Sequence, residues 1–353
     1  MNMKKNIKFG ILGLGRVIEN RVYKVFKNEL KNSKVISVFD KDNKKNLKYC
    51  KLFNVLKNNT LKNFLDKKLD YIYIATESGN HAHDIIKCFN ANKNVIVEKP
   101  PTLRIDQLIR LNNIAQKKKL KFYVIYQNRM NKSVEYLKKI ISKTFIKNTI
   151  FVNLKLLWSR KQSYYNDWHG KWLYDGGVIA QQGIHYIDLL CYLFGKPTKC
   201  VSVISNKSNK LQAEDTHLGI IKFKNNISCQ VSLTTALRPK DFEATIEIFQ
   251  KKKQIKLYGL CCNKIKIISY NSNKNKSVNF RKYNENVPSG YGLSHSKVFQ
   301  NIIDYDLKKD KRKPLKAIDT LNTLKLLQMM YKSSEKKRWA KISEKKLNSK
   351  LGF

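Results

Sequence analysis

The sequence lacks the long apolar runs and biased segments that mark membrane-spanning, fibrous or low-complexity proteins. Its apolar runs are short, as in Val95-Ile96-Val97, whereas a spanning helix needs about 18 apolar residues in a row. After the charged start Met1-Asn2-Met3-Lys4-Lys5, a brief apolar stretch reaches Gly13 with no small-residue cleavage site. The 14 glycines and 6 prolines are scattered among 353 residues, which excludes collagen-like chains. We expect a soluble, globular protein without a signal peptide.

Cysteine usage points away from a secreted protein and from a zinc site. The seven cysteines make an odd count, and none belongs to a Cys-x-x-Cys pair. We therefore expect no metal and a cytoplasmic location, where thiols stay reduced.

Acidic residues are scarce, with 26 against 71 basic ones, and the formal charge of +45 would suit a nucleic acid or an anionic membrane. Only ten of the basic residues are arginine, the residue that sequence-reading sites favour, and the lysines are spread along the whole chain. We expect neither nucleic-acid nor membrane partners, although such a field draws anionic small molecules into a cleft. We expect the lysine-rich segment 333–350 to be a solvated surface or tail.

Short apolar strands alternate with helical patterns in the first third of the chain, which is typical of a doubly wound parallel α/β sheet. Strands are expected at 7–12, 35–39, 70–75, 94–97 and 121–126, and helices at 81–90 and 103–118.

Alternating strands at hairpin-like spacing follow, and they predict an α+β domain with a mostly antiparallel, open sheet. The expected strands are 149–158, 199–204, 217–223, 227–235, 244–249, 254–258 and 264–270, and the expected helices are 177–194, 294–307 and 317–331. Asn225-Asn226 marks a turn between two of the strands.

Gly13-Leu14-Gly15-Arg16-Val17 follows the first strand and opens a helix, where glycines let backbone N–H groups approach a pyrophosphate. Ile18 fills the third position, which is usually small. Asp40 ends the second strand, where a carboxylate accepts hydrogen bonds from an adenosine ribose, and this favours NAD. Lys41 follows it and could instead meet a 2′-phosphate, so NADP stays open.

Glu98-Lys99-Pro100 lies at the C-terminal edge of a buried strand, where open parallel sheets bind ligands. Pro100 restricts the backbone of Lys99 to extended conformations. A surface turn in a lysine-rich protein explains these residues equally well.

The segment from Asp175 to Gly195 predicts a helix that Asp175 caps and Gly195 ends. One polar face of this helix carries Gln181, His185 and Asp188, beside an apolar stripe. A histidine there can take a proton from a substrate hydroxyl. A core histidine bonded to a neighbour is the alternative.

Five motifs, in this order and spacing, resemble the glucose-fructose oxidoreductase and inositol dehydrogenase family, also called Gfo/Idh/MocA: Gly13-Leu14-Gly15-Arg16, Ala75-Thr76 with His81, Glu98-Lys99-Pro100, Gln127-Asn128-Arg129, and Gly176-Gly177 with His185. The resemblance implies that Lys99 lies beside the nicotinamide and the substrate hydroxyl, and that His185 is the acid/base. It implies cofactor contacts at Gly13, Gly15, Arg16, Val17, Asp40, Thr76, His81, Glu98 and Gln127.

Three positions depart from the family pattern. The family often has Thr-Pro where this chain has Thr76-Glu77, and a small residue where it has Ile18. The Asp or Asn four residues before the helix histidine is Gln181 here, and an amide cannot exchange a proton at neutral pH. His185 would then do the acid/base work alone, while Gln181 orients a hydroxyl.

The loop 158–172 combines aromatic and basic residues, which suits a sugar or sugar-nucleotide. It resembles the Arg…Tyr-Tyr…Trp segment of family members that act on nucleotide-linked sugars in surface-polysaccharide pathways, although aromatic packing between domains is an alternative. Residues 289–295 also resemble a family segment near the substrate cleft. Substrate contacts are expected at Arg129, Arg160, Tyr165, Trp168, Trp172 and His295.

The resemblance predicts an NAD(P)-binding Rossmann domain over 1–126, a substrate and oligomerisation domain over 127–316, and a C-terminal helix with a lysine-rich tail over 317–353. The expected activity is that of a dehydrogenase or ketoreductase acting on a nucleotide-linked sugar, in a homo-oligomer. A free-sugar or cyclitol dehydrogenase and a non-catalytic dinucleotide- or sugar-binding regulator are the alternatives.

Overall fold

The computed structural model describes residues 6–270 and 276–353, which form two compact units. The first unit combines the chain up to Gln127 with Leu293–Thr320, and the second combines Asn128–Gly292 with Leu321–Phe353. Each unit has its own sheet, and each is described by itself.

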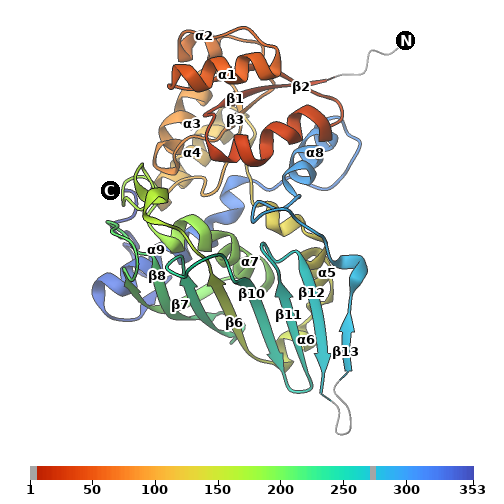
Figure 1. The fold of residues 1–353 in the computed structure, drawn as a ribbon, viewed down its shortest axis with the longest axis vertical. Helices are drawn as coiled ribbons and strands as arrows, with labels where there is room; N and C mark the ends of the chain where they lie inside the picture. Colours follow the sequence, from red (N-terminus) through yellow and green to blue (C-terminus); the bar gives the residue numbers. More distant parts are fainter. Residues whose placement is uncertain (1–5, 271–275) are drawn as a thin grey trace. The chain divides into compact units, whose positions relative to one another are not determined.

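The first unit contains a five-stranded parallel sheet in the order β2-β1-β3-β4-β5 (Figure 1). Its strands are β1 (Ile7–Leu12), β2 (Ser33–Phe39), β3 (Tyr71–Ile74), β4 (Asn94–Val97) and β5 (Phe122–Val124). Strand β2 lies on one side of β1, whereas β3, β4 and β5 follow one another on the other side. Because crossovers are right-handed, the helices cover opposite faces, and the ends of β1 and β3 meet at the switch point. The predicted doubly wound sheet is confirmed.

The helical segments of the first unit are η1 (Ile18–Val22), η2 (Val25–Glu29), α1 (Asn43–Phe53), α2 (Leu61–Leu65), η3 (Ser78–Asn80), α3 (His81–Asn90), α4 (Ile105–Lys117), α8 (His295–Asp306) and η8 (Ala317–Thr320). The predicted helices at 81–90 and 103–118 correspond to α3 and α4. Helix α1, which is rich in lysine, is not among the predicted helices. A cap defines its start, because the Asp42 side chain accepts from the backbone N–H groups of Lys44 and Lys45.

Helix α8 packs in the first unit, whereas the predicted division placed it in the second domain. Its Phe299 lies 4.8 Å from Phe26 and 5.1 Å from Tyr73 between ring centroids. The spacing of apolar residues along a helix shows that one face is buried, but it does not show which of the two domain cores that face packs against.

The second unit contains a nine-stranded sheet in the order β13-β12-β11-β10-β6-β9-β8-β7-β14. Among these described strands, only β6 and β9 pair in parallel. The strands are β6 (Thr149–Leu157), β7 (Pro197–Ser205), β8 (Thr216–Phe223), β9 (Ser228–Thr234), β10 (Glu243–Gln250), β11 (Lys253–Tyr258), β12 (Lys264–Ser269), β13 (Lys276–Asn279) and β14 (Ala340–Lys341). The seven predicted strands and the turn at Asn226, which has a φ of 67°, are confirmed.

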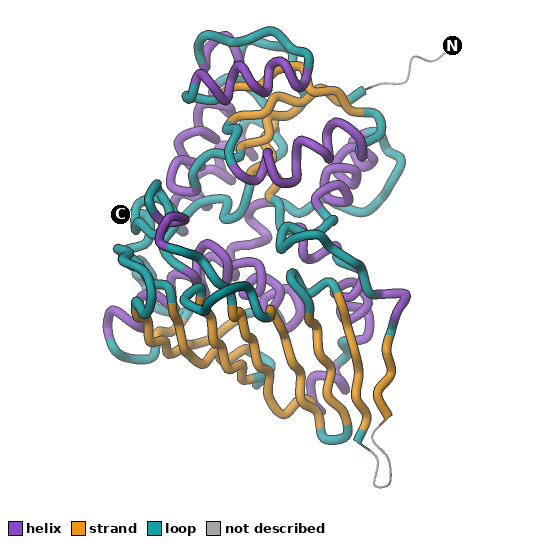
Figure 2. The backbone as a smooth tube through the Cα atoms, viewed as in Figure 1, coloured by secondary structure: helices purple, strands orange, loops and turns teal. Residues whose placement is uncertain are grey.

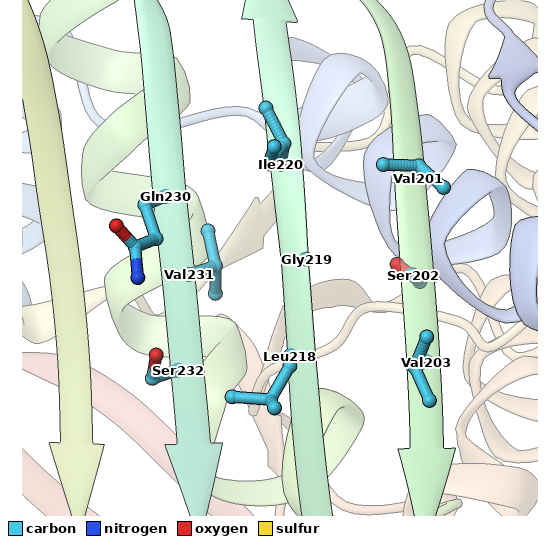
Figure 3. A pocket seen from close by; sticks show the side chains of 9 residues that line it. All are labelled: Val201, Ser202, Val203, Leu218, Gly219, Ile220, Gln230, Val231 and Ser232. Atoms are coloured by element: carbon cyan, nitrogen blue, oxygen red, sulfur yellow. The ribbon is translucent and has the colours of Figure 1, made fainter.

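The helical segments of this unit are η5 (Gln162–Tyr165), α5 (Lys132–Ile140), α6 (Lys143–Asn148), η6 (Ile179–Gly183), α7 (Ile184–Phe194), η7 (Arg281–Tyr283) and α9 (Leu321–Lys336), and η4 (Gln127–Met130) joins the two units. Figure 2 shows α7 and α9 on one face of the nine-stranded sheet. The opposite face exposes Val203, Leu218 and Ile220 along β7 and β8 (Figure 3). This confirms the predicted open sheet.

The predicted solvated tail is folded onto the second unit. Its lysines are largely exposed, but Leu347 and Leu351 are 6% and 0% exposed. The Gln328 side chain accepts from both the backbone N–H and the hydroxyl of Ser349. A few apolar residues between the lysines therefore anchor this C-terminal segment to the second unit, although its average composition predicts a solvated tail. None of the described helices is long and apolar enough to cross a membrane.

Candidate functional site

The turn after β1 carries the two predicted glycines, and the structure requires glycine at the first of them. Gly13 has a φ of 88°, and a Cβ on it would lie 2.6 Å from the Thr76 nitrogen. Neighbouring backbone and the left-handed conformation therefore exclude a side chain. A Cβ on Gly15 would meet no described atom within 4 Å. Open space beside a backbone N–H near the start of a helix is what a phosphate group needs.

The residues after this turn divide between solvent and core. Arg16 is exposed and Val17 is half-buried at the predicted phosphate site. Ile18, which departs from the usual small residue, is 0% exposed and begins the π-helical segment η1. Its side chain fills the core below the turn, which explains why a large residue is accommodated.

Asp40 follows β2 and is tied to the glycine turn. One carboxylate oxygen accepts from the Leu14 N–H at 2.7 Å, and the other accepts from the Asp42 N–H at 2.8 Å. Each oxygen keeps further lone-pair capacity for a ribose hydroxyl. Lys41, the residue expected to meet a 2′-phosphate, donates to the Glu77 carboxylate at 2.7 Å. That ion pair joins the ends of β2 and β3, on either side of β1.

Thr76 and His81 connect the segments that follow β3 and β4. The Thr76 hydroxyl donates to Asp84 at 2.7 Å. His81 is 1% exposed, with Nδ1 at 2.7 Å from the Pro100 carbonyl oxygen and Nε2 at 3.1 Å from the Thr76 carbonyl oxygen. Burial lowers the pKa of His81, and these two carbonyls partly offset that effect. The structure thus places His81 between two backbone segments and not on the surface of the predicted cofactor site.

Glu98 and Lys99 follow β4, and their side chains have different surroundings. Glu98 is 7% exposed and accepts a hydrogen bond from the Tyr73 hydroxyl, whereas Lys99 is half-buried. Gln127 is 2% exposed, and its amide oxygen has no hydrogen-bond partner among the described residues. An orphaned buried amide beside the strand ends fits a polar ligand such as a nicotinamide.

The dinucleotide half-site, which we define as Gly13, Gly15, Asp40, Lys99 and Gln127, belongs entirely to the first unit. Open space at Gly15, a carboxylate after β2 and the orphaned amide of Gln127 fit a nicotinamide dinucleotide. The glycine turn would hold its pyrophosphate, and Asp40 would hold its ribose. Gln127 would hold its nicotinamide, with Lys99 beside it.

The helix of the second unit that carries His185 begins with a buried cap from elsewhere in the chain. Asp175 was expected to cap it, but its side chain accepts from the Gly170 N–H instead. The Ile179 N–H donates to the Glu214 carboxylate at 2.9 Å, across 35 residues of sequence. A Cβ on Gly177 would lie 2.0 Å from the Glu214 carbonyl oxygen, so glycine is required for this approach. No local pattern in the sequence indicates the role of Glu214.

Burial raises the pKa of Glu214 to about 8, against the hydrogen bonds from Ile179 N–H and the Tyr331 hydroxyl. Folding therefore takes up a proton, and the free energy of unfolding should fall as pH rises from about 4.5 to about 8. We expect Glu214→Gln to remove a slope of up to about 1.4 kcal/mol per pH unit in urea unfolding curves. The exposed Glu335→Gln is the control, and an unchanged slope in Glu214→Gln would contradict the prediction.

Gln181 and His185 are the two half-exposed residues in an otherwise buried stretch from Val178 to Cys191. Gln181 lies in the π-helical segment η6, and His185 is the second residue of α7. A π-helical turn changes the phase of side chains along a helix and often occurs at functional sites. The structure therefore keeps both predicted side chains accessible. The predicted helix end at Gly195, with a φ of 86°, is confirmed.

Asp188 does not share the accessible face of His185. It is 1% exposed, and its two oxygens accept from Arg129 Nε and Nη2 at 2.7 and 2.6 Å. The Thr323 hydroxyl also donates to it. The shared polar face predicted for Gln181, His185 and Asp188 is therefore wrong at its third member, because Asp188 turns to these buried partners. Arg129, an expected substrate contact, has two nitrogens occupied within the fold.

The loop 158–172 packs largely within the second unit. Arg160 donates to Asp241 at 2.9 Å, and the Tyr165 hydroxyl lies 2.7 Å from the Thr235 hydroxyl. Tyr165 is 7% exposed, whereas Arg160, Trp168 and Trp172 are half-buried and can still present an edge to a ligand. We define these last three as the loop half-site; its contact with a substrate stays a prediction.

His295 lies in the first unit, at the start of α8, and is 1% exposed. Its Nε2 lies 3.7 Å from Glu98 Oε1. The structure thus places it against a carboxylate in the interior, and not on a surface that a substrate reaches.

Comparison with known proteins agrees with this organisation. A family model described as the oxidoreductase family, NAD-binding Rossmann fold, matches residues 7–126. The model for the C-terminal alpha/beta domain of the same oxidoreductases, named after Gfo/Idh/MocA, matches residues 138–342. Together they cover most of the chain.

Individual relatives are distant. Oxidoreductase P35 of Formosa agariphila is 25% identical over 253 residues, covering 69% of this chain and 78% of that protein. The scyllo-inositol 2-dehydrogenase (NADP(+)) IolW of Bacillus subtilis is 25% identical over 60% of this chain and 59% of its own length. The WlbA dehydrogenase of Bordetella pertussis, solved with NADH and UDP-GlcNAcA, has a TM-score of 0.83 at 23% identity over 96% of this chain and 99% of that one. This last likeness shows the fold.

Proposed function

The chain belongs to the Gfo/Idh/MocA family of NAD(P)-dependent oxidoreductases, and we propose that it is a dehydrogenase or ketoreductase acting on a CH–OH group of a nucleotide-linked sugar. The observation that carries the proposal is the accessible His185 on a helix whose other side chains are nearly all buried. The cofactor supplies the chemistry of hydride acceptance or donation when it is bound.

The protein's own residues handle the proton and the charge at the substrate oxygen. His185 takes the hydroxyl proton during oxidation and returns it during reduction. The Lys99 ammonium stabilises negative charge that develops on the same oxygen. Gln181 cannot titrate, so it orients a hydroxyl through its amide.

We propose NAD as the preferred cofactor. Asp40 presents a carboxylate at the end of β2, and Lys41 is engaged by Glu77 instead of being directed to a 2′-phosphate. An exposed ion pair is worth only about 0–1 kcal/mol, so NADP remains the second candidate. The NADP(+) in the name of the Bacillus relative supports that second candidate.

The loop half-site supports a nucleotide-linked sugar as substrate. The exposed edges of Trp168 and Trp172 can contact a sugar or base ring, and the Arg160 guanidinium can meet a phosphate or carboxylate. The UDP-sugar in the WlbA structure agrees with this choice. The cyclitol in the name of the Bacillus relative favours the alternative of a free sugar or cyclitol.

Steady-state assays with NAD or NADP against UDP-, GDP- and dTDP-sugars, free sugars and inositols test the proposal. We expect kcat/KM for at least one nucleotide-linked sugar to exceed that of its free sugar by about tenfold or more, because the nucleotide adds binding contacts. Arg160→Ala should lower the affinity for that substrate and leave the Kd of NADH unchanged. Equal kcat/KM for free and linked sugars would favour the cyclitol alternative. Binding without turnover would favour a regulator.

We also propose that the protein is a cytoplasmic homo-oligomer in which a second copy covers the open face of the nine-stranded sheet. Val203, Leu218 and Ile220 are 65%, 57% and 42% exposed on neighbouring strands, which is unusual for a solvated sheet face. The seven cysteines are free thiols and buried, which suits a reducing compartment. Sedimentation at the mass of one 41.4 kDa chain would contradict the oligomer.

A further inference from the structure

Three buried polar side chains of the first unit meet at the C-terminal end of β4. Glu98 is 7% exposed, Tyr73 is 0% exposed and His295 is 1% exposed. The Tyr73 hydroxyl donates to Glu98 Oε1 at 2.6 Å, and His295 Nε2 lies 3.7 Å from the same oxygen. These partners come from β3 and from the first residue of α8, so the carboxylate joins two distant parts of the unit.

The second oxygen of this carboxylate faces the main chain. Glu98 Oε2 accepts from the backbone N–H of Lys99 at 3.3 Å. The backbone N–H of Glu98 itself donates to the Ile74 carbonyl oxygen at 2.9 Å. These two hydrogen bonds therefore hold the successive peptide groups on either side of Glu98, and the Lys99 backbone follows directly from the second of them.

Glu98 keeps its negative charge in this interior. Burial by itself raises the pKa of a carboxyl group, but His295, the Tyr73 hydroxyl and the nearby Lys99 outweigh it and hold the pKa at about 2. A buried carboxylate is costly unless it is paired. The arrangement thus depends on all three partners.

We infer that Glu98 is a positioning residue for Lys99, and that Tyr73 and His295 act by holding the Glu98 carboxylate in place. The inference rests on the proposed function, because it takes Lys99 as the group that meets the substrate oxygen. When the backbone at Lys99 is held less firmly, the ammonium at the end of the Lys99 side chain is displaced. A displacement of about 1 Å can lower the reaction rate about a hundredfold. His295 thereby acts on the reaction through Glu98 without touching the substrate.

The variants Glu98→Gln, Tyr73→Phe and Lys99→Met test this inference in the full-length protein. Glu98→Gln keeps the size of the side chain and an oxygen for the Lys99 N–H, but removes the negative charge that lies 3.7 Å from His295 Nε2. We expect kcat to fall about tenfold or more, with the KM of the sugar and the Kd of NADH unchanged within about twofold. Tyr73→Phe removes one hydrogen bond and should show a smaller loss with the same pattern.

A double variant separates positioning from general stability. If Glu98 acts through Lys99, Glu98→Gln should lower kcat by less than about twofold in a Lys99→Met background. His295→Gln should lower kcat with the same pattern as Tyr73→Phe. Its control is His217→Gln, which removes another buried histidine that contacts the Ser202 hydroxyl in the second unit. We expect the control to retain wild-type kcat.

Three outcomes are distinguishable. Wild-type kcat in both Glu98→Gln and Tyr73→Phe, with a large loss in Lys99→Met, overturns the inference and leaves the proposed function intact. Equal losses from Glu98→Gln in both backgrounds also overturn it, because they indicate a structural role. Wild-type kcat in Lys99→Met overturns the proposed function itself. If Glu98→Gln does not fold, Tyr73→Phe in the two backgrounds gives the same comparison.

Discussion

Lys99→Met and His185→Ala should each lower turnover about a hundredfold or more, the size expected for a placed charge stabiliser or acid/base. Methionine keeps most of the length of lysine but cannot stabilise an alkoxide, and alanine cannot carry a proton. Neither side chain is needed for the pyrophosphate or ribose contacts, so the Kd of NADH should stay within a few-fold of wild type. Steady-state kinetics and NADH fluorescence titration measure the two effects.

If the two side chains act on one hydroxyl, the double variant should lose much less than the product of the two single losses, because the effects of residues that act as a unit are not additive. The exposed Lys117→Met on α4 controls for loss of one positive charge in a chain of net charge +45. Turnover that survives His185→Ala within a few-fold would show that the helix histidine is structural. The non-catalytic regulator would then be the better account.

Gly15→Val should abolish the stabilisation that NADH confers on the purified protein. A ligand that binds only the folded state adds about 2.7 kcal/mol at a concentration of about 100 times its Kd. A Cβ on Gly15 meets no described atom, so the variant should fold with nearly the wild-type melting temperature while filling the space beside the loop N–H groups. Thermal melts with and without NADH measure both properties.

Gly13→Ala is the matched comparison, because its Cβ would lie 2.6 Å from backbone and its φ is 88°. This variant should melt at a lower temperature even without NADH. Loss of stability in Gly15→Val without ligand would contradict the assignment of open space to a phosphate. A full NADH shift in Gly15→Val would contradict the placement of the dinucleotide.

Local patterns in the sequence were sufficient for most of the strands, for the glycine turn after β1 and for the place of His185 on a helix. A buried parallel strand such as Asn94–Val97 reads as a short apolar run, and its ends are marked by polar residues. The glycine turn is visible as Gly13-Leu14-Gly15 directly after the first strand, although the atoms that exclude a side chain at Gly13 belong to Ala75 and Thr76. Because these signals arise from residues adjacent in the chain, the two fold classes could be predicted.

Contacts between residues far apart in the sequence decided which polar side chains are buried and which partners they have. His81 and Asp188 are both polar residues on helical faces, and only the tertiary structure shows that two carbonyls hold the first and Arg129 holds the second. The cap of the His185 helix comes from Glu214, and the Glu98 carboxylate accepts from Tyr73 and lies 3.7 Å from His295 Nε2.

The sequence by itself determined most of the strands and helices and the set of candidate side chains for the site. Only the tertiary structure decided whether each polar side chain faces an open site or a buried partner. The physical reason is that periodicity reports burial of a face, whereas the partner of a buried charge is chosen by geometry between elements far apart in the chain. Glu98 shows the difference: its place at the end of β4 is visible in the sequence, and its partners Tyr73 and His295 are not.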